Sequence, residues 1–315
     1  MTAAPWASPE SGLGATAPTR QAHSPVTARP DDRWEHAGEA PRSVPLRPLT
    51  YMEILDHGFT VVRQRPRHAF AAAACVTSPS QLALALILRQ TFASDDFGQL
   101  IGLNSAITGA DQLFEGANLT VIALLTLGPL LASLFASIAL GQVVAEAALG
   151  RELGVGPMLA GAARRLPSVA IPWTIAHLAI VAGTFLFLLP GLILAVGFYL
   201  MGPVAGVEAP PLGQLFTRPL QLARGKPWRV LATWSLTGLV FGILTPVSAA
   251  IPLLIGQIAD PSWLWILRSV LASGMALFTA AATGAISVVA YLDARTRLEG
   301  LDLELATQAL RAGQP

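Results

Sequence analysis

The amino-acid sequence predicts an all-α polytopic membrane helix bundle, with six transmembrane helices arranged as three hairpins and an amphipathic interfacial helix before each hairpin. Composition is the first observation that predicts this fold class. Of the 315 residues, 53% are hydrophobic and 12% are charged, and the mean hydropathy is +0.57. A soluble domain carries about 25% charged residues. The chain therefore has too few charges to cover a water-exposed surface.

The second observation is the spacing of the charges along the chain. Asp, Glu, Lys and Arg are absent from residues 68–88, 116–145, 166–207, 230–259 and 269–292. About 20 apolar residues form a helix that crosses a hydrocarbon core of about 30 Å. The third stretch is 42 residues long, enough for two such helices, with Pro190-Gly191 as the expected turn between them. The sequence therefore predicts six spans.

The ends of the chain differ in composition from the middle. Residues 1–48 are rich in Ala, Pro, Ser, Thr and Arg and poor in aliphatic side chains, which predicts a disordered tail. Residues 49–292 form the six-helix membrane domain, and residues 293–315 form a charged helix or tail. Of the 20 Lys and Arg residues, 18 fall before the first span, after the last span, or in the two loops on the same side of the bundle. Because loops rich in Lys and Arg stay in the cytoplasm, we expect both termini there.

The usage of residue types also indicates an origin. The chain is rich in Ala and has one lysine, Lys226, among its 20 basic residues. This usage is typical of a high-GC bacterial genome. The expected location is therefore the bacterial cytoplasmic (inner) membrane.

A short motif, R-x-x-P, precedes each predicted hairpin, at 63–66, 164–167 and 224–227. Each copy closes a segment with an amphipathic pattern, and the first segment begins with the capping box of Thr50 and Glu53. Such segments either anchor the hairpins as a cytoplasmic collar, which we favour, or bind lipid or a partner. The candidate lipid or partner contacts are Arg63, Arg65, Arg164, Arg165, Arg224 and Lys226.

Motifs for common enzyme chemistry are absent from the sequence. It contains no metalloprotease H-E-x-x-H, P-loop, G-x-S-x-G or G-x-G-x-x-G motif. Its five histidines are scattered, and Cys75 is its single cysteine. We therefore expect no catalytic residue, no cofactor and no metal site. The net charge of +1, without an aromatic and basic RNA motif, weighs against nucleic acid as a partner.

Three polar residues fall inside or at the ends of predicted spans. Gln142 and Glu146 lie one turn apart, and either an ion pair of Glu146 with Arg151 or Arg164, or a polar vestibule, accounts for them. His177 lies well inside a span. Pairing with a backbone carbonyl is the favoured explanation for His177, and a proton relay is the alternative.

The charged segment after the last span carries four further candidates: Asp293, Arg295, Arg297 and Glu299. They either bind a partner protein or pack on the amphipathic segments. The sequence leaves these two interpretations open.

Three stretches of the sequence form a recognisable set: LRPLTYMEILD at 46–56, LARGKPWRVL at 222–231 and YLDARTRLEGLDLE at 291–304. Together they resemble a known bacterial family, the glycerophosphoryl diester phosphodiesterase membrane-domain proteins. In some members of this family the bundle is fused to a catalytic barrel, whose His-Arg and Glu-Asn-Thr patterns this sequence lacks. The resemblance therefore implies a membrane module without the enzyme.

The function that these observations favour is a non-catalytic membrane subunit or scaffold that anchors or organises partner proteins at the cytoplasmic membrane. Membrane lipids and a membrane or cytoplasmic protein are the expected partners. A transporter or lipid-handling protein is the alternative, and it requires a polar cavity near the midplane. An intramembrane enzyme is the third, and it requires converging titratable groups.

Overall fold

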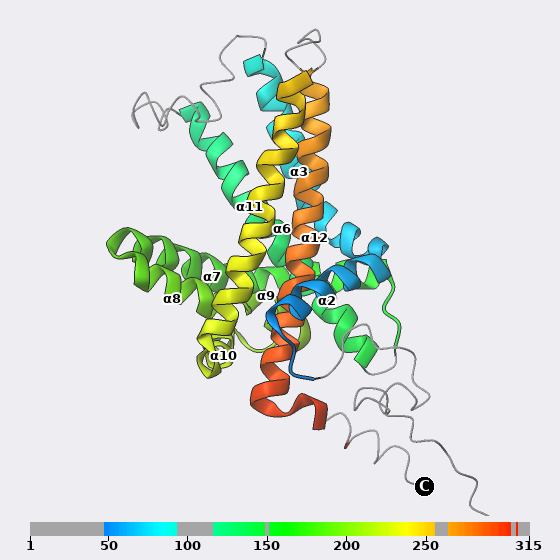
Figure 1. The fold of residues 1–315 in the computed structure, drawn as a ribbon, viewed down its shortest axis with the longest axis vertical. Coiled ribbons are helices and arrows are strands. Elements are labelled where there is room, and N and C mark those ends of the chain that lie inside the picture. The colour runs from blue at the N-terminus through cyan, green and yellow to red at the C-terminus, as the bar shows by residue number, and fades with distance from the viewer. Residues whose placement is uncertain (1–46, 93–115, 149–150, 256–263, 304–306, 308–315) are drawn as a thin grey trace, which may run out of the picture. The chain divides into compact units, whose positions relative to one another are not determined.

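The fold is described by a computed structural model for residues 47–92, 116–148, 151–255, 264–303 and 307. The predicted disordered tail, except Arg47 and Pro48, lies outside these residues. The regular secondary structure within these ranges is helical, as predicted. The helices are α2 (Tyr51–Gln64), α3 (Pro66–Phe92), α6 (Gly116–Ala148), α7 (Val155–Leu186), α8 (Leu188–Phe198), α9 (Met201–Val207), α10 (Leu212–Gly225), α11 (Pro227–Ile255) and α12 (Leu264–Glu299) (Figure 1).

Membrane-spanning character follows from length and composition. Five helical segments in the described part of the chain are long and apolar enough to cross a membrane: Thr126–Ala148, Val155–Leu186, Leu188–Val207, Pro227–Pro252 and Ile266–Glu299. The first predicted span falls in α3, a 27-residue helix that is not among the five. The chain is thus an α-helical polytopic membrane protein.

The core is organised around α12, which packs against α2, α3, α6 and α11. Small residues make this possible, because they let helix backbones approach closely. Ala281, Ala282 and Ala285 have no exposed surface, and a Cβ on Gly284 would lie 2.8 Å from the Cβ of Ala136 on α6. At these residues α12 is therefore held against α6 by close contact between the two helices.

Two of the three R-x-x-P motifs mark breaks between helices. The residue before a proline is disfavoured in the α conformation, and proline is well suited to the first position of a helix. Arg65 (φ −126°, ψ 55°) therefore separates α2 from α3, and Lys226 (φ −150°, ψ 71°) separates α10 from α11. Both breaks join an amphipathic helix to a long apolar one, as expected.

The second motif differs from the expectation. Pro167 lies inside α7, which runs without a break from Val155 to Leu186. A separate interfacial helix before the second hairpin is therefore not observed. The predicted segment 156–165 forms the first turns of the long helix instead.

The turn between the third and fourth predicted spans also differs. Phe187, with extended backbone (φ −154°, ψ 132°), separates α7 from α8, and Pro190 lies in the first turn of α8, where its missing N–H leaves no helical bond unmade. Gly191 instead allows contact between the two helices, since a Cβ at this position would lie 2.5 Å from the backbone nitrogen of Thr184 on α7. The observed turn, at Phe187, is thus three residues earlier than the predicted turn at Pro190.

Candidate functional site

Polar contacts gather on the last turns of α12, where charged and aromatic residues recur every four positions. Residues four apart lie on the same face of a helix. Tyr291, Arg295 and Glu299 therefore lie along one face, toward α10, and Asp293 and Arg297 lie along another, toward α2. These two faces build two separate sets of polar contacts.

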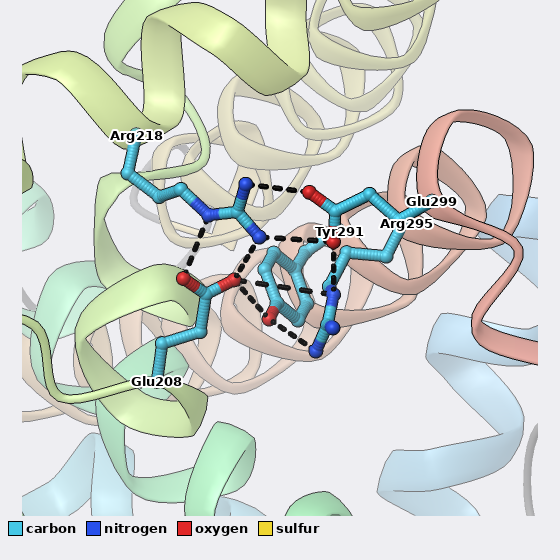
Figure 2. Close-up of polar contacts among 5 residues, drawn as sticks. All are labelled: Glu208, Arg218, Tyr291, Arg295 and Glu299. Atoms are coloured by element: carbon cyan, nitrogen blue, oxygen red, sulfur yellow. Dashed lines mark hydrogen bonds and ion pairs between the residues drawn. The ribbon is translucent and has the colours of Figure 1, made fainter. Parts of the chain in front are cut away.

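The first set, which we call the carboxylate–guanidinium network, consists of Glu208, Arg218, Tyr291, Arg295 and Glu299 (Figure 2). Arg218, on α10, donates to both oxygens of Glu208, with Nε to Oε2 at 2.7 Å and Nη2 to Oε1 at 3.0 Å. Its Nη1 lies 2.5 Å from Oε1 of Glu299. The network therefore ties the end of α9 and α10 to α12.

Two donors on α12 complete this network. The Tyr291 hydroxyl donates to Oε1 of Glu208 at 2.8 Å, and Nε of Arg295 donates to Oε2 of Glu299 at 2.8 Å. Two acidic groups thus meet two basic groups and a phenol. Hydrogen bonds from Arg218 to Glu208 and then to Glu299 raise the pKa of Arg218 above its ordinary value. The charges satisfy one another, so removal of one partner leaves a partly buried charge uncompensated.

The backbone between Glu208 and α10 is constrained. Ala209 has φ of +46°, a conformation that is uncommon for residues other than glycine. It is followed by Pro210 and Pro211, and Pro211 is the N-cap of α10. The hydrogen bonds between Glu208 and Arg218, ten residues apart, span this corner.

The second set, the Asp293 clasp, holds the start of α2. The buried backbone N–H of Leu49 donates to Oδ1 of Asp293 at 2.8 Å, and Nη2 of Arg297 donates to the carbonyl of Leu49 at 2.7 Å. Arg297 Nε also donates to both oxygens of Asp293, at 2.9 and 3.0 Å. Arg229, on α11, donates to the same Leu49 carbonyl and lies over the Tyr51 ring at 4.7 Å. The clasp therefore joins α2, α11 and α12.

The capping box predicted for α2 is confirmed. Glu53 N–H donates to the Thr50 hydroxyl at 3.3 Å, and Thr50 N–H donates to Glu53 Oε2 at 2.6 Å. Arg47 forms an ion pair with Glu53 at 2.6 Å. The backbone hydrogen bond from Thr50, assisted by Arg47, lowers the pKa of Glu53 to about 2. The box fixes the first turn of α2 next to the clasp.

The predicted intramembrane polar residues do not come together in one site. Gln142 Nε2 donates to the carbonyl of Ile138 at 3.3 Å, and Glu146 pairs with Arg151 at 2.6 Å. Nδ1 of His177 lies 2.9 Å from the carbonyl of Trp173, whose ring centroid is 3.9 Å from that of the imidazole. Each of the three has a partner within its own helix or the adjoining loop.

The predicted basic residues divide into two groups. Arg63, Arg164, Arg224 and Lys226 are exposed, and Arg65 is partly exposed. Arg165 differs, since its Nη1 donates to the carbonyls of Ala205 and Gly206 in the last turn of α9. A helix end has carbonyls without helical partners, so Arg165 caps α9. Asp293, Arg295, Arg297 and Glu299 all pack on neighbouring segments.

Four residues whose side chains form hydrogen bonds in the two sets were not predicted from the sequence: Glu208, Arg218, Arg229 and Tyr291. The four-residue spacing of Tyr291, Arg295 and Glu299 is the signal that could have found Tyr291. Glu208 and Arg218 have no such signal, because the Ala209 corner brings them together.

Within the described ranges, no group of three or more His, Cys, Asp or Glu residues is arranged to hold a metal ion. Comparison with protein-family models, with curated proteins and with solved structures finds no match for this chain.

Proposed function

We propose that the protein is a non-catalytic membrane subunit or scaffold, which organises partner proteins at the cytoplasmic face of the bacterial inner membrane. Six spans with both termini cytoplasmic are part of this proposal. The single observation that carries it is the joining of α2, α10, α11 and α12 by the carboxylate–guanidinium network and the Asp293 clasp. These side-chain contacts fix the four helices to one another and make one end of the bundle a rigid platform.

The platform also offers a surface for a partner. An open, polar groove is lined by Glu208, Gln214, Thr217, Arg218 and Gln221. Gln214, Thr217 and Gln221 are exposed and lie on α10, which the network fixes to α12. Neutral polar side chains on a rigid helix are suited to hydrogen bonds with a cytoplasmic protein.

We also propose that the protein belongs to the family that it resembles, and the clasp supports this proposal. The three stretches that carry the resemblance to the glycerophosphoryl diester phosphodiesterase membrane-domain proteins contain Leu49, Arg229 and Asp293. These three residues contact one another in the clasp. A shared structural contact gives a reason for three distant stretches to resemble one family together. We propose no hydrolytic activity, because the carboxylates of the network and of the clasp are held by arginines rather than free to act as acid or base.

Site-specific photo-crosslinking in cells tests the scaffold role. A photoreactive residue at Thr217 or Gln221 should give discrete protein adducts, while one at Ile243, an exposed apolar residue of α11, should not. Arg218→Gln should reduce the adducts at Thr217 by loosening α10. Equal adducts at all three positions, or none at Thr217 and Gln221 in a folded protein, would overturn the proposal.

A further inference from the structure

The corner between α10 and α11 contains a small cavity with an excess of positive charge. Lys226, Arg229 and Arg297 line this cavity, and Asp293 is the one carboxylate among its lining residues. The corner packs tightly on α12, because a Cβ on Gly225 would overlap Leu298. The cavity of about 20 Å³ has room for one water-sized group.

The cations of this corner are not balanced by the acceptors around them. Asp293 already accepts hydrogen bonds from Arg297 and from the backbone N–H of Leu49. Arg229 Nε is buried, lies 3.4 Å from Asp293 Oδ2 and forms no hydrogen bond within the described ranges. Lys226 is exposed and forms no ion pair with any described residue. Three cations, Lys226, Arg229 and Arg297, thus share one carboxylate, which leaves net positive charge at this corner.

The backbone adds to this positive field. Pro227 is the first residue of α11, a 29-residue helix, and the N-terminus of a long helix attracts anions. Trp228, in the same first turn, is 76% exposed. Trp is enriched at membrane–water interfaces. Since α11 contains a candidate span, its first turn is expected at the depth of the lipid headgroups.

We propose that this corner binds the phosphate of an anionic phospholipid headgroup. Lys226 and Arg229 donate to phosphate oxygens, and one oxygen enters the small cavity; Arg297 adds charge, and Trp228 contacts the glycerol region. The exposed Trp228 favours a lipid over free phosphate as the source of this group. The inference rests on the proposed placement of the collar at the membrane surface, but not on a protein partner.

Lipid titration of the full-length purified protein in detergent, read by native mass spectrometry, tests the site. We expect phosphatidylglycerol to bind and phosphatidylcholine to bind at least about tenfold more weakly. Lys226→Gln should weaken phosphatidylglycerol binding about tenfold, since it removes one charge-assisted hydrogen bond. Lys226→Arg should retain binding. Arg67→Gln is the matched control, because Arg67 is an exposed cation directly after a proline at the start of α3.

Three results would overturn the proposal: equal binding of the two lipids, equal losses in Lys226→Gln and Arg67→Gln, or displacement of the lipid by millimolar inorganic phosphate. The last would assign the corner to a free anion. If Lys226→Gln does not fold, the lipid selectivity of the unmodified protein and the phosphate competition decide. Crosslinking from Thr217 should be unchanged in Lys226→Gln, so failure of the scaffold role and failure of the lipid site can be distinguished.

Discussion

The backbone N–H of Leu49 donates a 2.8 Å hydrogen bond to Asp293, which lies 244 residues further along the chain. Leu49 is the residue before the N-cap of α2, and Asp293 lies two turns before the end of α12. Both are buried. Because Arg297 also binds the carbonyl of Leu49, a single peptide segment is held from both sides by α12. The first described helix and the last one are thereby joined.

The first prediction concerns this clasp. Asp293→Asn should lower the free energy of unfolding by about 3 kcal/mol, because it leaves the partly buried Arg297 and Arg229 without a counter-ion. Thermal unfolding of the detergent-solubilised protein measures the change. Asp56→Asn, at an exposed position on α2, is the control and should change stability little. Similar melting temperatures for both variants would show that the clasp is dispensable.

The second prediction separates the two kinds of donor to Glu208. Tyr291→Phe should cost about 1 kcal/mol, the net value of one hydrogen bond. Arg218→Gln should cost more, since Glu208 and Glu299 both lose a charged partner. A double-mutant cycle of Glu208→Gln with Arg218→Gln should give a coupling energy above about 1 kcal/mol. Additive effects would contradict the network.

The third prediction uses the lowered pKa of Glu53. A carboxyl group whose folded pKa is about 2, below its ordinary value of 4.5, stabilises the folded state above pH 4.5. That contribution is lost as the pH falls from 4.5 toward 2. The protection factors of the first-turn amides of α2, which correct for the intrinsic pH dependence of exchange, should therefore fall over this range. Glu53→Gln should show faster exchange already at pH 7 and a flatter pH dependence; an unchanged profile would argue against the capping box.

The fourth prediction compares two glycines with similar local sequence but different surroundings. Gly284→Ala should destabilise the protein by about 1–3 kcal/mol, because its Cβ would press against Ala136. Gly238→Ala, on α11, has no atom within 4 Å of the new Cβ. It should be neutral or stabilising by up to about 1 kcal/mol, since alanine is the better helix former. Thermal unfolding of both variants in one detergent distinguishes them.

The fifth prediction tests the proposed orientation. In a Cys75→Ser background, cysteines replacing Gly156 or Gln214 should be protected from an impermeant thiol reagent on intact cells, whereas one replacing Asp260 should react. All three should react after the cells are permeabilised, which controls for accessibility. The reverse pattern on intact cells would invert the orientation derived from the basic residues.

Several features of the fold were predictable because they depend on local chemistry. Charge-free stretches predict apolar helices wherever a membrane is the solvent. The Thr50–Glu53 box and the breaks at Arg65 and Lys226 were predicted because capping and proline sterics act within four residues. The pairing of Glu146 with Arg151, five residues apart, was one of the alternatives that the sequence left open.

Tertiary structure decided the rest. Nothing within four residues indicates whether Pro167 breaks a helix, and α7 continues through it. Nor did the sequence decide whether the charges after the last span bind a partner or their own chain. That choice depends on Leu49, Glu208 and Arg218, which only packing brings to α12. The local sequence pattern determined the helices and their apolar faces. The network and the clasp were decided by packing, because interactions between distant residues depend on the positions of whole helices.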